Sequence, residues 1–157
     1  MPGEALFLGI ATMAVAVAGF TAVTSTLVPP DGSWSPVMRI RQRAIVSTSF
    51  NVMFEALALL IVYAWLDDLH AALVVASAGV TVYATWVVVY RGRQFIRAGG
   101  YRTRSSLVLF AAGPTATLLF AANALVFASV AVYALALCVQ LSVAVISFYT
   151  LVSAAQS

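Results

Sequence analysis

A carboxylic acid in the middle of a long apolar stretch is the residue of this sequence best suited to chemistry. Glu55 lies at the midpoint of the stretch 44–66. An ionisable side chain at the centre of a bilayer costs at least about 2.5–3.5 kcal/mol, and such groups usually face the interior of a helix bundle or an aqueous cavity. Burial disfavours the charged form of a carboxyl group. Glu55 is therefore predicted to bind a proton or a cation.

Two further polar residues share a helical face with Glu55. Asn51 and Ser47 precede it by four and eight residues, a spacing that brings side chains to one side of a helix. Beyond Glu55 the stretch is apolar, apart from the hydroxyl of Tyr63. Polar residues that begin near one end of the stretch and stop at its middle would suit a water-filled vestibule. Alternatively, Glu55 only hydrogen-bonds to a neighbouring helix, which stabilises a bundle by about 0.6–2 kcal/mol per bond.

Other apolar stretches carry polar groups at a similar depth. Gln140 lies near the centre of the last stretch, and Thr117 near the centre of the one before it. Next to Thr117, the pair Gly113 and Pro114 predicts a kink, because proline lacks the N–H of a helical hydrogen bond. Kinked helices at this depth can expose carbonyl oxygens to an ion, although a kink can also serve packing alone. The predicted ion or proton site comprises Glu55, Asn51, Ser47, Gln140 and Thr117.

The composition places these residues in a membrane. The chain has 157 residues, of which 63% are hydrophobic and 8% charged. A soluble domain has about 25% charged residues, and a disordered chain has low hydrophobicity, so both classes are excluded. The composition predicts an integral membrane protein with a single transmembrane domain over residues 1–157.

The apolar stretches predict an all-α bundle of five transmembrane helices. A helix needs about 20 apolar residues to cross the hydrocarbon core. The stretches that meet this length are 5–28, 44–66, 71–90, 106–128 and 129–153. No charge, glycine or proline separates the last two. Together they are far too long for one span, so a very short turn is predicted between residues 123 and 129.

All eight basic residues are arginines, and they occupy two loops. The first loop contains Arg39, Arg41 and Arg43, and the second contains Arg91, Arg93, Arg97, Arg102 and Arg104. The opposite side carries Glu4, Asp67, Asp68 and His70. The positive-inside rule predicts a multi-pass protein of the cell membrane with its N-terminus outside and its C-terminus in the cytoplasm. The second loop is also a candidate for contact with anionic lipid headgroups.

Enzymatic chemistry is not predicted. The chain has one histidine and one cysteine, His70 and Cys138. One histidine cannot build a bis-histidine haem site or a metal centre, and a lone cysteine cannot form an intrachain disulfide. Known catalytic and phosphate-binding motifs are missing from the sequence. No cofactor or metal is therefore expected. Nucleic acid is not an expected partner either, because the arginines lie between apolar spans.

Small residues recur at helical spacing in the first stretch. One face carries Gly9, Thr12, Ala16 and Gly19, and a second carries Ala11, Ala14, Ala18, Ala22 and Ser25. Such faces let another helix approach closely, within one subunit or between subunits. The sequence therefore predicts a homo-oligomeric ion or proton channel, or a small carrier, that uses Glu55. The alternative is a non-catalytic accessory or structural subunit of a larger membrane complex.

Overall fold

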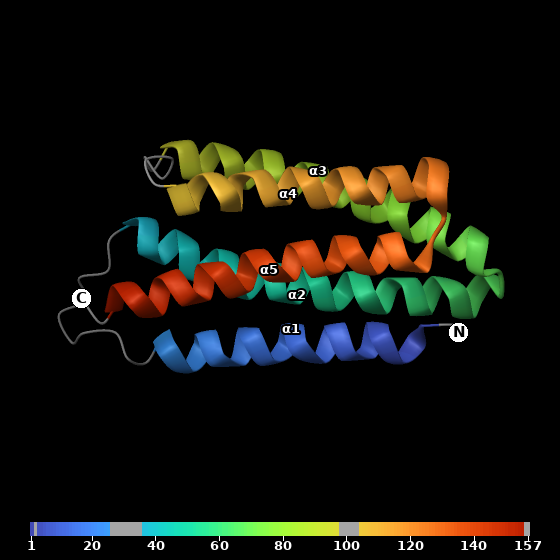
Figure 1. The fold of residues 1–157 in the computed structure, drawn as a ribbon, viewed down its shortest axis with the longest axis horizontal. Coiled ribbons are helices and arrows are strands. Elements are labelled where there is room, and N and C mark those ends of the chain that lie inside the picture. Colours follow the sequence, from blue (N-terminus) through green and yellow to red (C-terminus); the bar gives the residue numbers. More distant parts are fainter. Residues whose placement is uncertain (2, 26–35, 98–103, 156–157) are drawn as a thin grey trace.

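The chain forms a bundle of long helices that run side by side (Figure 1). The computed structural model describes residues 1, 3–25, 36–97 and 104–155. Within these ranges the elements are α1 (Glu4–Ser25), α2 (Pro36–Leu66), α3 (Leu69–Arg97), α4 (Arg104–Ala122), the π-helix η2 (Asn123–Phe127) and α5 (Val130–Ala155). The predicted all-α fold is confirmed.

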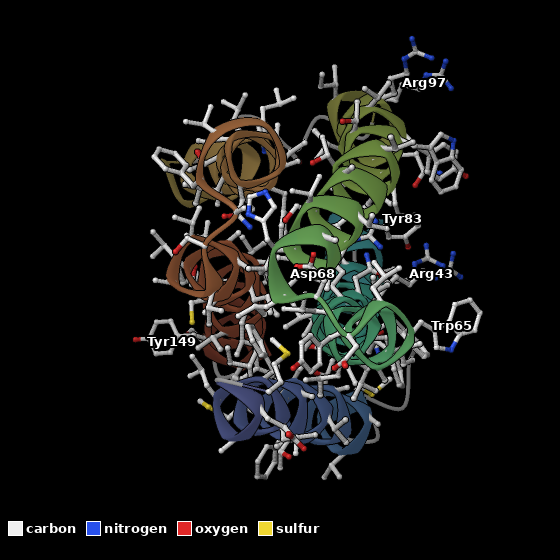
Figure 2. All side chains as sticks on the ribbon, turned by 90° about the vertical axis from the view of Figure 1, so that its right-hand side faces the viewer. Arg43, Trp65, Asp68, Tyr83, Arg97 and Tyr149 are labelled. Carbon is white, nitrogen blue, oxygen red and sulfur yellow. The ribbon has the colours of Figure 1, made fainter. Side chains whose placement is uncertain are left out.

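The central pair of the bundle is α2 and α5. Helix α1 packs against both of them, α3 packs on α2 and α4, and α4 packs on α5. Viewed along the helices, α1 lies at one edge of the bundle, and α3 and α4 lie at the opposite edge (Figure 2). The middle of α2, which carries Glu55, is therefore enclosed on the side that faces α5.

Tyr133 of α5 is the side chain that joins most of the bundle. It is fully buried, and its ring makes edge-to-face contacts with Phe7 of α1, at 5.8 Å between centroids, and with Phe120 of α4, at 5.1 Å. Such aromatic pairs add about 0.5–1.5 kcal/mol to the burial of their area. The hydroxyl of Tyr133 donates to the main-chain oxygen of Glu55 at 2.8 Å. One residue thus fixes α1, α2, α4 and α5 around the predicted site.

The turn between α4 and α5 is built on Asn123. The main-chain N–H of Ala128 donates to the carbonyl oxygen of Asn123, and the N–H of Ser129 donates to its side-chain Oδ1, both at 2.8 Å. Ala128 adopts the left-handed conformation, with φ of 43°. The side-chain Nδ2 of Asn123 donates to Ser77 Oγ on α3 at 2.9 Å. The chain therefore reverses direction between residues 123 and 129, where the sequence predicts a turn.

Four helices in the described part of the chain contain a segment long and apolar enough to cross a membrane. These segments are Glu4–Val23, Gln42–Leu66, Leu69–Gln94 and Val130–Thr150. The apolar segment of α4 and η2, Ala111–Phe127, is shorter. The protein is thus a helical membrane protein, and a fifth crossing stays a prediction.

Charge is distributed unequally between the two ends of the bundle. Arg43 near the start of α2 lies at the same end as Arg91, Arg93 and Arg97 near the end of α3, because these two helices are antiparallel and joined at Asp67 and Asp68. The carboxylates of Glu4, Asp67 and Asp68 belong to the opposite end. This asymmetry is the one on which the predicted orientation rests, and the orientation itself stays a prediction.

Candidate functional site

Glu55 lies inside the bundle. Its exposed fraction is 5%, and its neighbours Val52 and Ala56 on α2 are fully buried. The side chain of Gln140 on α5 lies beside the Glu55 carboxyl group and is its polar neighbour from that helix. The carboxyl oxygen Oε2 is buried and has no hydrogen-bond partner among the described residues. The structure therefore brings together two of the predicted site residues, Glu55 and Gln140, and leaves one carboxyl oxygen available.

Asn51 and Ser47 turn toward α3. Asn51 Oδ1 accepts a hydrogen bond from the hydroxyl of Tyr83 at 2.9 Å. Ser47 Oγ donates to the carbonyl oxygen of Arg43 at 2.7 Å and accepts from Arg91 Nη2. An α-helix turns by about 100° per residue, so each step of four residues rotates the side chain by about 40°. From Glu55 back to Ser47, over two such steps, the polar side chains therefore shift from the α5 side of α2 to its α3 side.

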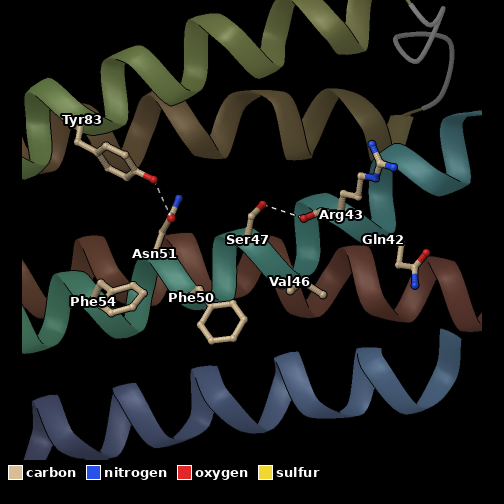
Figure 3. Close-up of a pocket in the computed structure, with 8 residues that line it drawn as sticks. All are labelled: Gln42, Arg43, Val46, Ser47, Phe50, Asn51, Phe54 and Tyr83. Carbon is tan, nitrogen blue, oxygen red and sulfur yellow. Dashed lines mark hydrogen bonds between the residues drawn. The ribbon is translucent and has the colours of Figure 1, made fainter.

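A groove of about 630 Å³ opens between α2 and α3 at the arginine-rich end (Figure 3). Its lining consists of Gln42, Arg43, Val46, Ser47, Phe50, Asn51, Phe54 and Tyr83. We call it the α2–α3 groove. It contains Ser47 and Asn51 of the predicted vestibule but not Glu55, which follows Phe54 and projects about 100° away from it. The groove thus ends beside the buried carboxyl group without reaching it.

Thr117 is not brought to Glu55 by the contacts of the described residues. Its hydroxyl donates to the carbonyl oxygen of Gly113 within α4, at 3.0 Å, and α4 packs on α3 and α5. Helix α4 continues through Pro114. A Cβ atom at Gly113 would lie 3.3 Å from Val88 Cγ2 of α3. Gly113 therefore permits a close approach of α3 and α4.

The predicted headgroup arginines differ in their surroundings. Arg91 folds onto α2, where Nη1 donates to Thr48 Oγ1 at 3.0 Å and Nη2 donates to Ser47. Arg93 and Arg97 are exposed. Arg102 and the side chain of Arg104 lie outside the described residues. Arg91 thus joins α3 to α2, and it is also a candidate for binding a lipid headgroup.

The sequence reasoning missed Tyr83 as the partner of Asn51. The signal for it was present, because Asn51 and Tyr83 lie equally far from the turn at Asp67. Antiparallel neighbours place such residues at the same depth. Tyr133 and the link between Asn123 and Ser77 were also missed, because they depend on which helices are neighbours.

Comparison with known proteins adds no relative: no family model, no curated protein and no solved structure matches this chain.

Proposed function

We propose that this membrane protein is a small transport protein in which Glu55 takes up and releases a proton. The observation that carries the proposal is the buried carboxyl group in the middle of α2, which lies beside Gln140 and whose Oε2 has no partner among the described residues. A carboxyl group in such surroundings favours its neutral form, and ionisable groups at this depth commonly belong to proton relays. Gln140 supplies a polar partner for either form, since an amide both donates and accepts.

The enclosure of Glu55 favours a carrier over an open pore within one subunit. The α2–α3 groove stops at Phe54, one residue before Glu55. Glu55 would therefore become accessible only when the surrounding helices move. Access from one side at a time would then follow from movement of α2 against α5. We place the protein in the cell membrane with the arginine-rich end in the cytoplasm, as the positive-inside rule requires.

Proton flux into liposomes tests the proposal. Purified protein is reconstituted with a pH-sensitive dye inside the vesicles, and a potassium gradient with valinomycin drives proton entry. We expect wild-type vesicles to acidify faster than protein-free vesicles, and Glu55→Gln to abolish the difference. The matched control is Glu4→Gln, because Glu4 is an exposed carboxylate at the far end of the bundle. Equal flux through wild type and Glu55→Gln would remove Glu55 from the mechanism.

A second candidate function is that of an accessory subunit of a membrane complex. The observation that favours it is the outer face of α1, where Gly9, Thr12, Ala16 and Gly19 are all exposed. Apart from the adjacent backbone of α1 itself, no described atom lies within 4 Å of a Cβ built at Gly9 or Gly19. Faces of small residues let another transmembrane helix pack closely. Purification from the native membrane distinguishes the two functions: a stoichiometric second protein supports the accessory role, and a homo-oligomer alone supports the carrier.

A further inference from the structure

We propose that the α2–α3 groove binds an anionic phospholipid, with the phosphate at Arg43 and one acyl chain along Phe50 and Phe54. This inference does not depend on proton transport, because it rests on different residues from those that surround Glu55. The charge at the mouth of the groove, the length of the groove and the chemistry of its walls all match such a lipid.

The mouth of the groove is positively charged, and no described carboxylate lies near it. Arg43 lines it and is exposed, and Arg91, which is not part of the lining, donates to the lining residue Ser47. Within the described ranges, the single ion pair joins the N-terminal amine to Glu4. The described carboxylates either belong to the other end of the bundle or, like Glu55, are buried inside it. Guanidinium groups bind phosphate oxygens with good geometry, so an anionic headgroup complements this end.

The length of the groove matches one leaflet of a bilayer. Its lining runs along α2 from Gln42 to Phe54, which is about 18 Å at 1.5 Å per residue. One leaflet contributes about 15 Å of hydrocarbon. The apolar segment of α2 begins at Gln42, so Arg43 lies at the headgroup level and Phe54 near the midplane. A lipid with its phosphate at Arg43 would therefore lay an acyl chain along the whole groove.

The deeper walls of the groove are apolar and open to the surroundings of the bundle. Phe50 and Phe54 are 44% and 62% exposed, and their rings stack at 6.5 Å between centroids. Tyr83 of α3 forms the opposite wall and is held by its hydrogen bond to Asn51 (Figure 3). A free phosphate ion would leave these aromatic walls unused, whereas an acyl chain would cover them. The volume of about 630 Å³ lies in the range of ordinary ligand sites.

Native mass spectrometry of the full chain in neutral detergent tests this site. Detergent removes the surface potential of a charged bilayer, so the dissociation constant reports the groove. Phosphatidylglycerol is expected to bind at least tenfold more tightly than phosphatidylcholine. Inorganic phosphate is not expected to displace bound phosphatidylglycerol. Arg43→Gln should weaken phosphatidylglycerol binding about tenfold, the loss of about 1.4 kcal/mol.

Arg39→Gln is the matched control, because Arg39 is an exposed arginine one turn earlier on α2 that does not line the groove. It should change the dissociation constant by less than about twofold, since a surface charge contributes little in a neutral micelle. Glu55→Gln should bind phosphatidylglycerol as wild type does, which separates this site from proton transport. Any of three results would overturn the proposal. These are equal losses of phosphatidylglycerol affinity in Arg43→Gln and Arg39→Gln, equal affinities for the two lipids, and displacement of phosphatidylglycerol by inorganic phosphate.

Discussion

Replacing both Glu55 and Gln140 by methionine should leave the bundle at least as stable as wild type, whereas replacing Gln140 alone should destabilise it. Methionine is unbranched and adapts to irregular gaps in a core, so it retains most of the side-chain volume. The comparison asks whether this polar pair is present for stability or for chemistry. If Glu55 is a proton site, its removal together with its partner costs function but not folding.

The magnitudes follow from the burial of the pair. Glu55 is 5% exposed, and its Oε2 has no hydrogen-bond partner in the described part of the chain. In Gln140→Met the buried carboxyl group would lose the amide beside it as a polar partner, at a cost of about 1–3 kcal/mol. Hydrogen bonds between transmembrane helices average about 0.6 kcal/mol, which favours the lower end. Replacement of both partners by apolar groups is close to neutral or stabilising.

The free energy of unfolding is measured in mixed micelles with increasing sodium dodecyl sulfate, with the loss of helical circular dichroism as the signal. The four proteins of the double-mutant cycle are compared under one set of conditions. Proton flux in liposomes is measured in parallel, and both variants that lack Glu55 should lose it.

The result that would refute this reasoning is a double variant less stable than wild type by more than about 2 kcal/mol. The contact between Glu55 and Gln140 would then be a structural bond between α2 and α5. Glu55 would be a packing residue, and the proposal of proton transport would lose its main support.

Two further predictions concern the elements that hold the site, and both are read by the same unfolding measurement. Asn123→Leu should lower the free energy of unfolding by about 2–3 kcal/mol, because the N–H of Ser129 and the hydroxyl of Ser77 both lose a partner. Ser77→Ala loses only the bond between helices and should lower it by about 0.6 kcal/mol. Equal losses in the two variants would contradict the role of Asn123 in the turn. Gly113→Leu should cost about 1–3 kcal/mol through overpacking against Val88. Gly79→Ala on α3 should be neutral or slightly stabilising, because apart from the adjacent backbone of α3 no described atom lies within 4 Å of its Cβ. A neutral Gly113→Leu would show that α3 and α4 are not in close contact there.

The sequence alone determined that this protein is helical and belongs in a membrane. Both properties depend on composition and on the length of apolar stretches, which are local quantities. It also located Glu55 at the middle of an apolar stretch, because depth along a helix depends only on the number of residues from each end. The turn between residues 123 and 129 followed from length in the same way.

The tertiary structure decided which way each side chain faces. Ser47, Asn51 and Glu55 look like one stripe at a spacing of four residues, but the stripe drifts around α2. Asn51 therefore meets Tyr83 on α3 while Glu55 meets Gln140 on α5. Arg91, which the sequence places only at a membrane boundary, folds back onto Ser47 and Thr48. These pairings depend on which helices are neighbours and on how each is rotated about its axis, and neither is encoded in the periodicity of a single segment.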